Sequence, residues 1–270
     1  MLIFENKIIT KILFPLSWPY FVFVRIKNFF YDHKILKQYS LPCKVISVGN
    51  IMVGGSGKTP AVEFIAQWLK KHGKKVVILS RGYKRTSRGL VVVSDGKTLH
   101  TDVYSAGDEA YLLARKLKDV PVLVDKKRER AGLMACKTFT PDFILLDDGY
   151  QYRRLARNID IVMFDNFEAI RNIRLLPAGP YREPCSSLNR AHLCWFSKLN
   201  DDYQAVPDNW SPFQLIRSKY IPVKISHFKN EMDEIDLKQL KNKKVFAFCG
   251  IANPKSFMRT LKDLNVQIYG

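Results

Sequence analysis

Cysteine is scarce in this chain, and its few cysteines show no pairing by spacing. The five cysteines among 270 residues form no C-x-x-C pair and have no histidine partner at metal-ligand spacing. The pattern therefore indicates neither a zinc site nor a disulfide framework. A reducing cytosol is the simplest compartment for such a protein.

Acidic side chains are also in short supply. The chain has 25 Asp and Glu residues against 44 Lys and Arg residues, which leaves a formal net charge of +19 at pH 7. This balance favours anionic partners such as nucleic acid, phosphorylated substrates or acidic membrane surfaces, and charge alone does not choose among them. The hydrophobic content of 47% excludes a disordered protein and allows one large domain or two modest ones.

No apolar run is long enough to predict a membrane span. The best candidate, Ile12 to Val24, is shorter than the roughly 20 residues that a span requires, and it contains Pro15 and Pro19. A signal peptide is disfavoured as well, because no small-residue cleavage site follows the run.

The same amino-terminal segment is rich in aromatic residues and flanked by lysine and arginine on both sides. One interpretation is an interfacial element, with Trp18, Tyr20, Phe21 and Phe23 in the lipid headgroup region and the cations facing anionic lipid. The other is a helix packed on the protein's own core. The residues alone favour membrane contact and leave the second interpretation open.

The stretch most typical of a binding site is V-G-G-S-G-K-T-P at residues 53–60. Its glycines let backbone N–H groups turn toward an anion, Lys58 adds a positive charge, and the Thr59 hydroxyl can bind Mg²⁺. Apolar, β-branched residues at 43–48 predict a buried strand before it, and the spacing at 60–71 predicts a helix after it. A strand, a glycine loop and a helix N-terminus together predict a phosphate site.

This glycine loop departs from the common G-x-x-x-x-G-K-[ST] pattern, because Met52 stands at its first glycine. It is similar to the deviant G-G-x-G-K-T loop, although Val53 replaces the lysine that precedes that loop. A glycine-rich turn that binds nothing is the alternative, and Lys-Thr at a helix start argues against it. We expect a nucleotide to contact Met52, Val53, Gly54, Gly55, Ser56, Gly57, Lys58 and Thr59.

Apolar strands alternate with helical stretches from residue 43 onward. This predicts an α/β fold, P-loop NTPase-like, with a mostly parallel sheet and helices on both faces. Ligands of such sheets lie beyond the carboxyl ends of the strands. Polar clusters fall there at Ser80–Tyr83, Asp125–Arg128 and Asp147–Gln151, so one rim should collect the phosphate loop, cations and carboxylates.

Several of these polar residues have two readings. An apolar strand ending in Asp147-Asp148 has the form of a second nucleotide motif that orients Mg²⁺, and which aspartate does so is open. Asp108 is predicted to be a helix N-cap, and a carboxylate at this rim could also act as a base. Arg81, Lys127 and Arg128 either clamp phosphate oxygens or are exposed charges, and Arg81, between a buried strand and Gly82, is the best candidate.

A proline-fixed loop at residues 175–184 completes the set. It contains one Arg-Glu pair and either borders a substrate site or braces a domain junction. Its residues alone do not decide between these two roles.

Six groups of motifs occur in one order along nearly the whole chain. They are Gly49-Asn50 with Val53–Pro60, Ser80–Tyr83, Gly107–Glu109, Asp147–Gln151 with Arg153–Leu155, Leu176–Pro184, and Gly250–Pro254 with Phe257. Together they resemble the tetraacyldisaccharide 4′-kinase (lipid A 4′-kinase) family. The ordered set is far more specific than any one motif.

The resemblance implies a peripheral enzyme at the cytoplasmic face of the bacterial inner membrane. It would transfer the γ-phosphate of ATP to the 4′-hydroxyl of a tetra-acylated disaccharide 1-phosphate, making lipid IVA in lipid A biosynthesis. ATP and Mg²⁺ are the implied cofactors. The amino-terminal segment is implied to contact anionic membrane, and no nucleic acid is expected.

The resemblance also implies roles for individual residues. Lys58 and Thr59 hold phosphate and Mg²⁺, Arg81 and Arg128 serve the phosphates, and Asp108 is the base. Glu109, Asp147 and Asp148 organise the metal. The resulting catalytic set is Asp108, Lys58 and Asp147, and the metal ligands are Thr59, Glu109 and Asp148.

With this resemblance we expect four regions. Residues 1–31 form an amphipathic membrane-associating segment, 32–209 the P-loop kinase domain, 210–236 a connector and 237–270 the start of a smaller α/β domain. The last region stops on a fresh strand, so we expect it to be truncated.

The chain departs from the family pattern at three places. Tyr152 replaces a histidine, whose stacking or hydrogen bond a tyrosine can supply, and Ala110 replaces a proline. The family's Asp-His-His motif, whose histidine assists the base, would follow Gly270. We therefore expect a chain that binds ATP but turns over slowly, and a version extended through that motif would test this expectation.

Two rival classes remain open. A partitioning or nucleic-acid ATPase would suit the deviant loop and the basic charge, and it predicts salt-sensitive DNA binding. A membrane-docked scaffold with a decayed site is the other.

Overall fold

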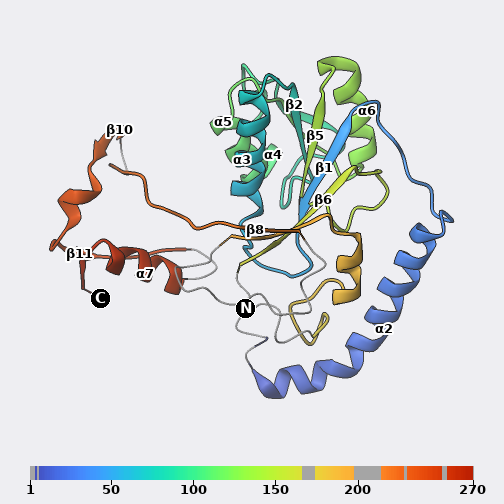
Figure 1. Ribbon diagram of the computed structural model, residues 1–270, viewed down its shortest axis with the longest axis horizontal. Coiled ribbons are helices and arrows are strands. Elements are labelled where there is room, and N and C mark those ends of the chain that lie inside the picture. Colours follow the sequence, from blue (N-terminus) through green and yellow to red (C-terminus); the bar gives the residue numbers. More distant parts are fainter. Residues whose placement is uncertain are drawn as a thin grey trace. The chain divides into compact units, whose positions relative to one another are not determined.

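The computed structural model describes residues 4, 6–165, 174–197, 214–227, 230–250 and 254–269. The chain divides into two compact units, 1–218 and 219–270. Figure 1 labels their elements along the chain.

An eight-stranded sheet forms the centre of the first unit, in the order β3-β4-β2-β5-β1-β6-β7-β8. Its neighbouring strands pair in parallel, except that β3 is antiparallel to β4. The predicted mostly parallel sheet is thus confirmed. The strands are β1 (Lys44–Gly49), β2 (Val76–Ser80), β3 (Val91–Ser94), β4 (Val122–Val124), β5 (Phe143–Asp147), β6 (Ile159–Phe164), β7 (Leu193–Phe196) and β8 (Gln214–Arg217).

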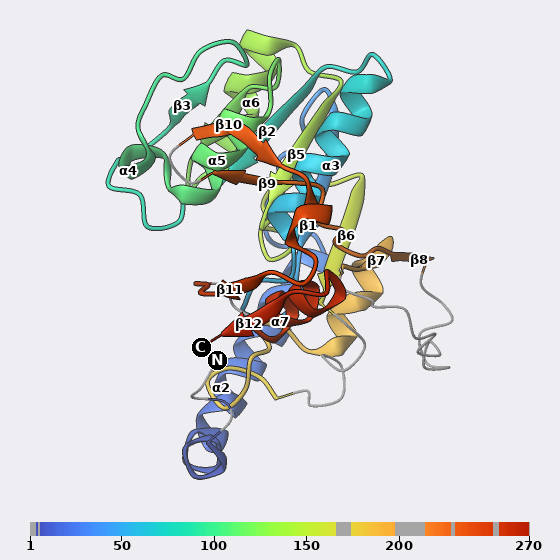
Figure 2. The same cartoon turned by 90° about the vertical axis from the view of Figure 1, so that its left-hand side faces the viewer.

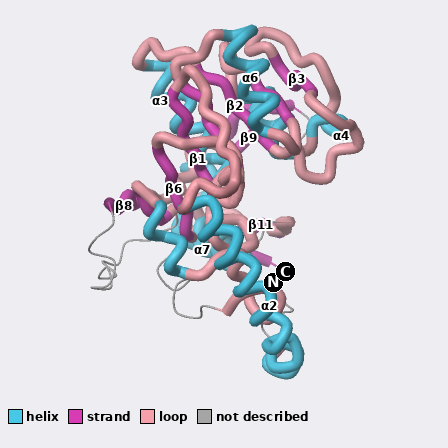
Figure 3. Tube along the Cα trace, turned by 90° about the vertical axis from the view of Figure 1, so that its right-hand side faces the viewer, coloured by secondary structure: helices cyan, strands magenta, loops and turns pink. Residues whose placement is uncertain are grey.

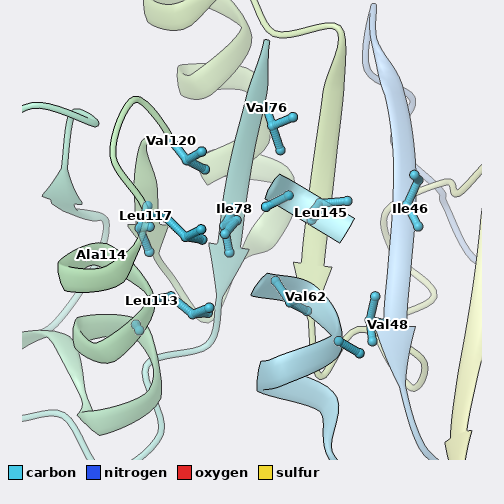
Figure 4. Packing of buried hydrophobic residues seen from close by; sticks show 14 of the residues in the cluster. Ile46, Val48, Val62, Val76, Ile78, Leu113, Ala114, Leu117, Val120 and Leu145 are labelled. Carbon is cyan, nitrogen blue, oxygen red and sulfur yellow. The ribbon is translucent and has the colours of Figure 1, made fainter. Parts of the chain in front are cut away.

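Helices cover both faces of this sheet, as predicted. Among the described residues, the helices that follow β1 in this unit are α3 (Lys58–Lys71), α4 (Val103–Ala106), α5 (Asp108–Lys116), α6 (Arg128–Phe139) and the short 3₁₀ helix η2 (Cys185–Arg190). On one face, Val62 of α3 and Leu113 of α5 pack with Ile78 and Leu145 of the strands (Figure 4). On the other face, the buried alanines of α6 pack with the alternate strand residues. The sheet is therefore buried on both sides, which explains its continuous apolar strands.

The strand β8 differs from our expectation of a connector at 210–236. It pairs in parallel with β7 and forms one edge of the sheet, and Ile216 packs against the main core. These sheet hydrogen bonds join residues 214–217 to the first unit, so the chain divides after residue 218. Residues 210–213 of the expected connector lie outside the described residues.

The long helix α2 (Lys7–Asp32) precedes the sheet and curves along its length (Figures 1 and 3). Pro15 and Pro19 lie inside it and remove two amide donors, which accounts for the curvature. The helix extends beyond the apolar run at 12–24. By length and composition, its stretch Ile8–Asp32 is the one helix of the described chain that could cross a membrane.

The second unit contains two small sheets (Figure 2). The strands β9 (Ile225–His227) and β10 (Asn230–Ile235) pair antiparallel. A short 3₁₀ helix, η4 (Leu237–Leu240), follows. The strands β11 (Lys244–Phe246) and β12 (Gln267–Tyr269) pair in parallel, and α7 (Pro254–Asp263) lies between them in sequence. The expected strand, helix and strand are thus present, whereas residues 251–253 of the Gly250–Pro254 motif lie outside the described part.

Candidate active site

The glycine loop lies between β1 and α3, as its sequence predicts. Gly54 and Gly57 have φ values of 122° and 77°, a left-handed region that glycine adopts at little cost. Ser56 is buried, and its hydroxyl accepts a hydrogen bond from Asn50 Nδ2 at 2.9 Å. The loop therefore has a fixed backbone that leads into the N-terminus of α3 at Lys58, where free amides and the helix dipole favour an anion.

Asp147, the last residue of β5, is buried at the carboxyl end of the sheet and is 1% exposed. Its Oδ2 accepts a hydrogen bond from Ser80 Oγ at 3.2 Å, and its Oδ1 has no hydrogen-bond partner. Burial, together with the charges of Glu109 and Asp148, raises the pKa of Asp147 to about 7, although Lys58 opposes this shift. A buried carboxylate oxygen without a donor is a ready ligand for a cation.

Asp148 has a different environment. Both of its carboxylate oxygens accept hydrogen bonds from Arg182 Nη1, at 3.1 and 3.0 Å, and Oδ1 lies 3.6 Å from Lys58 Nζ. Burial alone would raise the pKa of Asp148, but Lys58 and Arg182 outweigh it and hold the pKa below its usual value. Asp148 is thus paired with Lys58 and Arg182, the two cations that a phosphate would attract.

Arg128 is buried at the first position of α6. Its guanidinium lies over the ring of Tyr152, with 4.1 Å from Cζ to the ring centroid, and Nη2 donates to the Asp148 carbonyl at 3.5 Å. The Tyr152 hydroxyl accepts from the Arg128 amide at 3.1 Å and donates to Glu129. Tyr152 therefore both stacks on Arg128 and hydrogen-bonds to it, and it holds Arg128 beside the two aspartates.

The remaining predicted residues approach the same rim from α5 and from the end of β2. Glu109 lies near enough for its charge to act on Asp147, and the exposed Arg81 near enough to act on Arg128. A Cβ at Gly107 would come within 2.7 Å of the Tyr83 carbonyl oxygen. The segment after β2 and the start of α5 are therefore packed closely together.

The prediction that Asp108 is an N-cap is wrong. The N-cap of α5 is Gly107, with φ of 87°, and Asp108 is the first helical residue. The short helix α4 ends at Gly107, so the glycine between the two helices takes the capping position. The Asp108 side chain is exposed in the first turn, where the helix dipole favours a carboxylate.

The sequence did not identify Arg182 as a site residue. Its backbone amide donates to the Ile51 carbonyl at 2.7 Å while its guanidinium binds Asp148. The neighbouring Glu183 is buried and binds Arg190 at 3.0 Å. The Arg-Glu pair thus divides between the rim and the interior, so the loop both borders the site and braces the fold.

The oxygen donors at this rim fit a magnesium ion better than a metal held by protein alone. Within the described ranges, no group of three or more His, Cys, Asp and Glu side chains is arranged to hold a metal. Asp147 Oδ1, the Glu109 carboxylate and the Thr59 hydroxyl are hard oxygen donors. Mg²⁺ commonly takes one or two carboxylates and completes its coordination with water and substrate phosphates.

Three comparisons agree on what the chain resembles. Residues 9–269 match the family model described as tetraacyldisaccharide-1-P 4′-kinase. The chain is 37% identical to the tetraacyldisaccharide 4′-kinase of Aquifex aeolicus, over 95% of this chain and 78% of that protein. It is 36% identical to that of Halothermothrix orenii, over 97% and 73% respectively. The crystal structure of an "apo" form of LpxK from Aquifex aeolicus in complex with ATP is similar, with a TM-score of 0.77 at 35% identity over 96% of this chain and 79% of that one.

Proposed function

Because the chain belongs to the tetraacyldisaccharide-1-phosphate 4′-kinase family, we propose that it transfers the γ-phosphate of ATP to the 4′-hydroxyl of a tetraacyldisaccharide 1-phosphate in lipid A biosynthesis. The observation that carries the proposal is the meeting of Lys58, Asp148 and Arg182 beside the buried Asp147. This arrangement places cations and carboxylates at the end of a phosphate-binding loop.

The residues of the rim suit phosphoryl transfer, which depends mainly on alignment and on neutralising charge. The loop amides, Lys58 and Arg182 hold the phosphate oxygens, and Arg81 and Arg128 add positive charge. Asp148 pairs with both Lys58 and Arg182. A triphosphate exchanges these ion pairs for its own contacts, so the rim needs little rearrangement to bind it.

Asp147, Glu109 and Thr59 are the residues that would hold Mg²⁺. Asp147 thereby takes the metal role that the resemblance assigned to Asp148, since Asp148 is engaged by two cations. When bound, Mg²⁺ supplies positive charge to the phosphate oxygens. The exposed Asp108 at the start of α5 is the candidate to accept the proton of the sugar hydroxyl, an effect of about 10²- to 10⁴-fold in rate.

The outward face of α2 is apolar and therefore suits contact with a lipid substrate and with the membrane. Large apolar side chains recur along this face and are exposed: Ile8, Ile12, Leu16, Phe23, Ile26 and Phe30. The opposite face carries the buried Thr10, Ser17 and Val24. A helix that turns Thr10 and Ser17 toward the protein and large apolar side chains outward has the polarity expected for contact with lipid.

The contacts of α2 favour a helix that lies on the membrane over one that spans it. Ser17, Tyr20 and Asn28 all hydrogen-bond the segment at residues 175–187, and Asp32 binds Arg153 at 2.6 Å. The helix is thus attached to the rest of the first unit over most of its length. A spanning orientation would carry that polar surface into hydrocarbon, which is costly.

Acidic substitutions on the outward face of α2 are expected to weaken membrane binding. The double variant Leu16→Glu/Phe23→Glu should bind vesicles of phosphatidylglycerol at least about 100-fold less tightly, because two large apolar side chains leave the bilayer. Vesicle sedimentation measures this affinity. The matched control is Phe64→Glu/Trp68→Glu on α3, whose aromatic side chains are similarly exposed. Equal losses in both double variants would contradict the assignment of α2.

The reaction itself is tested with γ-labelled ATP, Mg²⁺ and a tetra-acylated disaccharide 1-phosphate in detergent. Label is expected in the lipid, and Lys58→Ala should reduce the rate by about 10²- to 10³-fold, since it removes a charge at the transferred group. Lys70 lies on the same helix as Lys58 and forms an exposed ion pair with Asp119. Lys70→Ala should therefore leave the rate unchanged. ATP hydrolysis stimulated by DNA would instead support a nucleic-acid ATPase, and an inert protein would support a scaffold.

A further inference from the structure

One face of α2 is joined to the segment that carries Arg182. Thr10, Ser17 and Val24, which are buried, recur at intervals of two helical turns. Tyr20 and Asn28 fall on the same face and are half-buried. Asn28 Nδ2 donates to Glu183 Oε2 at 2.9 Å. The helix therefore meets the 180–183 stretch through polar contacts as well as through packing.

Tyr20 contacts the residue whose side chain pairs with Asp148 at the phosphate site. Its hydroxyl donates to the main-chain carbonyl of Arg182 at 2.8 Å. Burial raises the pKa of Tyr20, so the hydroxyl stays a neutral donor at physiological pH. The hydrogen bond fixes the backbone at the residue whose side chain enters the rim.

From Arg182, further contacts lead directly to the phosphate loop. Its amide donates to the Ile51 carbonyl at 2.7 Å, and the Val53 amide donates to the Pro180 carbonyl at 2.8 Å. Its guanidinium binds Asp148 at 3.0 Å, and Asp148 lies 3.6 Å from Lys58 Nζ. The 180–183 stretch is thus held between α2 on one side and the glycine loop on the other.

We infer that Tyr20 is a positioning residue, which holds Arg182 in place to bind the phosphates of ATP. The inference rests on the proposed function, because it takes the rim to be the ATP site. It adds that the membrane-facing helix is also part of the support of the nucleotide site. A lipid-anchoring role for α2 alone does not require the Tyr20 hydroxyl.

The variant Tyr20→Phe removes this hydroxyl and keeps the ring. Ser17→Ala is the matched control, because Ser17 Oγ donates to the Leu175 carbonyl at 3.0 Å and accepts from the Ala178 amide at 3.2 Å. Both variants lose buried hydrogen bonds between α2 and the same loop. Only Tyr20→Phe loses one at Arg182.

The affinity for MgATP is measured by calorimetry on the full chain, together with the lipid phosphorylation rate and binding to phosphatidylglycerol vesicles. Tyr20→Phe is expected to weaken MgATP binding about three- to tenfold, as loss of one hydrogen bond predicts, and to leave vesicle binding unchanged. Ser17→Ala is expected to retain the wild-type affinity for MgATP. Phosphorylation by Tyr20→Phe should be rescued in part by high ATP concentrations.

Equal MgATP affinity in wild type and Tyr20→Phe would overturn the inference, and so would equal weakening in both variants, which would show a general effect of helix docking. These readouts do not depend on transfer to lipid. A wild-type chain that binds MgATP but never labels the lipid would contradict the proposed function, while selective weakening in Tyr20→Phe would still support the role of Tyr20.

Discussion

Asp147→Asn is expected to slow phosphoryl transfer by about 10²- to 10³-fold and at the same time to stabilise the ligand-free protein above pH 7. The carboxyl is buried, one oxygen has no hydrogen-bond partner, and its pKa is raised from 3.8 to about 7 by burial and by Glu109 and Asp148. The folded state therefore binds the proton more tightly than the unfolded state. The stability associated with this group is fully present below about pH 4 and is lost as the pH rises through 7.

The neutral asparagine removes this loss because it cannot ionise. We expect the free energy of unfolding of Asp147→Asn to exceed that of wild type by about 1–3 kcal/mol at pH 8, and by less than about half of that difference at pH 5. The rate of lipid phosphorylation should fall by about 10²- to 10³-fold, because a ligand for the cation is lost. Urea unfolding at the two pH values measures the first effect, and the labelled-ATP assay measures the second.

Asp125→Asn is a control for which the opposite change in the free energy of unfolding is expected. Asp125 is equally buried, but Arg130 binds it at 2.6 Å. Although burial alone would raise the pKa of Asp125, Arg130 and the Lys127 amide hold it below its usual value. Its substitution should therefore lower the free energy of unfolding at pH 8. A lower free energy of unfolding for Asp147→Asn than for wild type at pH 8 would contradict the conclusion that the Asp147 carboxylate has no cationic partner to offset its burial.

Arg182→Ala is expected to lower kcat/KM for ATP by about 100-fold, because a charge that faces the phosphates is removed. A second effect adds to the first. Without Arg182, Asp148 keeps Lys58 as its principal cation, so Lys58 becomes harder for ATP to recruit. Both the KM for ATP and kcat should change, and Arg182→Lys should recover only part of the loss because lysine cannot reproduce the guanidinium geometry.

Steady-state kinetics over a range of ATP concentrations separates these contributions. Arg115→Ala, an exposed arginine in the last turn of α5, is the charge-matched control and should behave as wild type. The assignment of Arg182 to the phosphate site would be wrong if Arg182→Ala had wild-type kinetics and bound MgATP normally.

The sequence predicts those features that depend on local pattern. Alternation of apolar strands and helices gave the parallel sheet, and the carboxyl-end rule placed Ser80, Asp147 and the glycine loop at one rim. These predictions hold because each strand is buried on both faces and so has a continuous apolar signal. The resemblance to the 4′-kinase family is confirmed by the match over residues 9–269.

Features that depend on tertiary contacts could not be predicted from the local sequence pattern. The bond between Asp148 and Arg182 joins residues far apart in sequence, and nothing near either residue indicates its partner. The different environments of Asp147 and Asp148 arise because Asp147 closes a buried strand while Asp148 turns away with φ of 50°. An extended piece near β8 was expected within the connector, but its place in the sheet was not, because the strand is short and its edge position is only partly buried.

The orientation of α2 is another feature that the sequence alone did not predict. Its composition indicated both an interfacial helix and a helix packed on the core. The contacts of Ser17 and Tyr20 show which face meets the protein, and the exposure of Ile12 and Phe23 shows which face does not. The choice depends on polarity around the helix together with the position of its partner loop, and only the folded chain supplies the second.

We propose that one rim of the sheet binds the triphosphate of ATP between Lys58, Arg182 and Asp147. A crystal structure of the chain with Mg²⁺ and a non-hydrolysable ATP analogue tests it most directly. We expect phosphate oxygens to contact Lys58 and Arg182 in place of Asp148, with the cation on Asp147. A triphosphate bound away from the glycine loop, with the Asp148 ion pairs to Lys58 and Arg182 intact, would contradict the account.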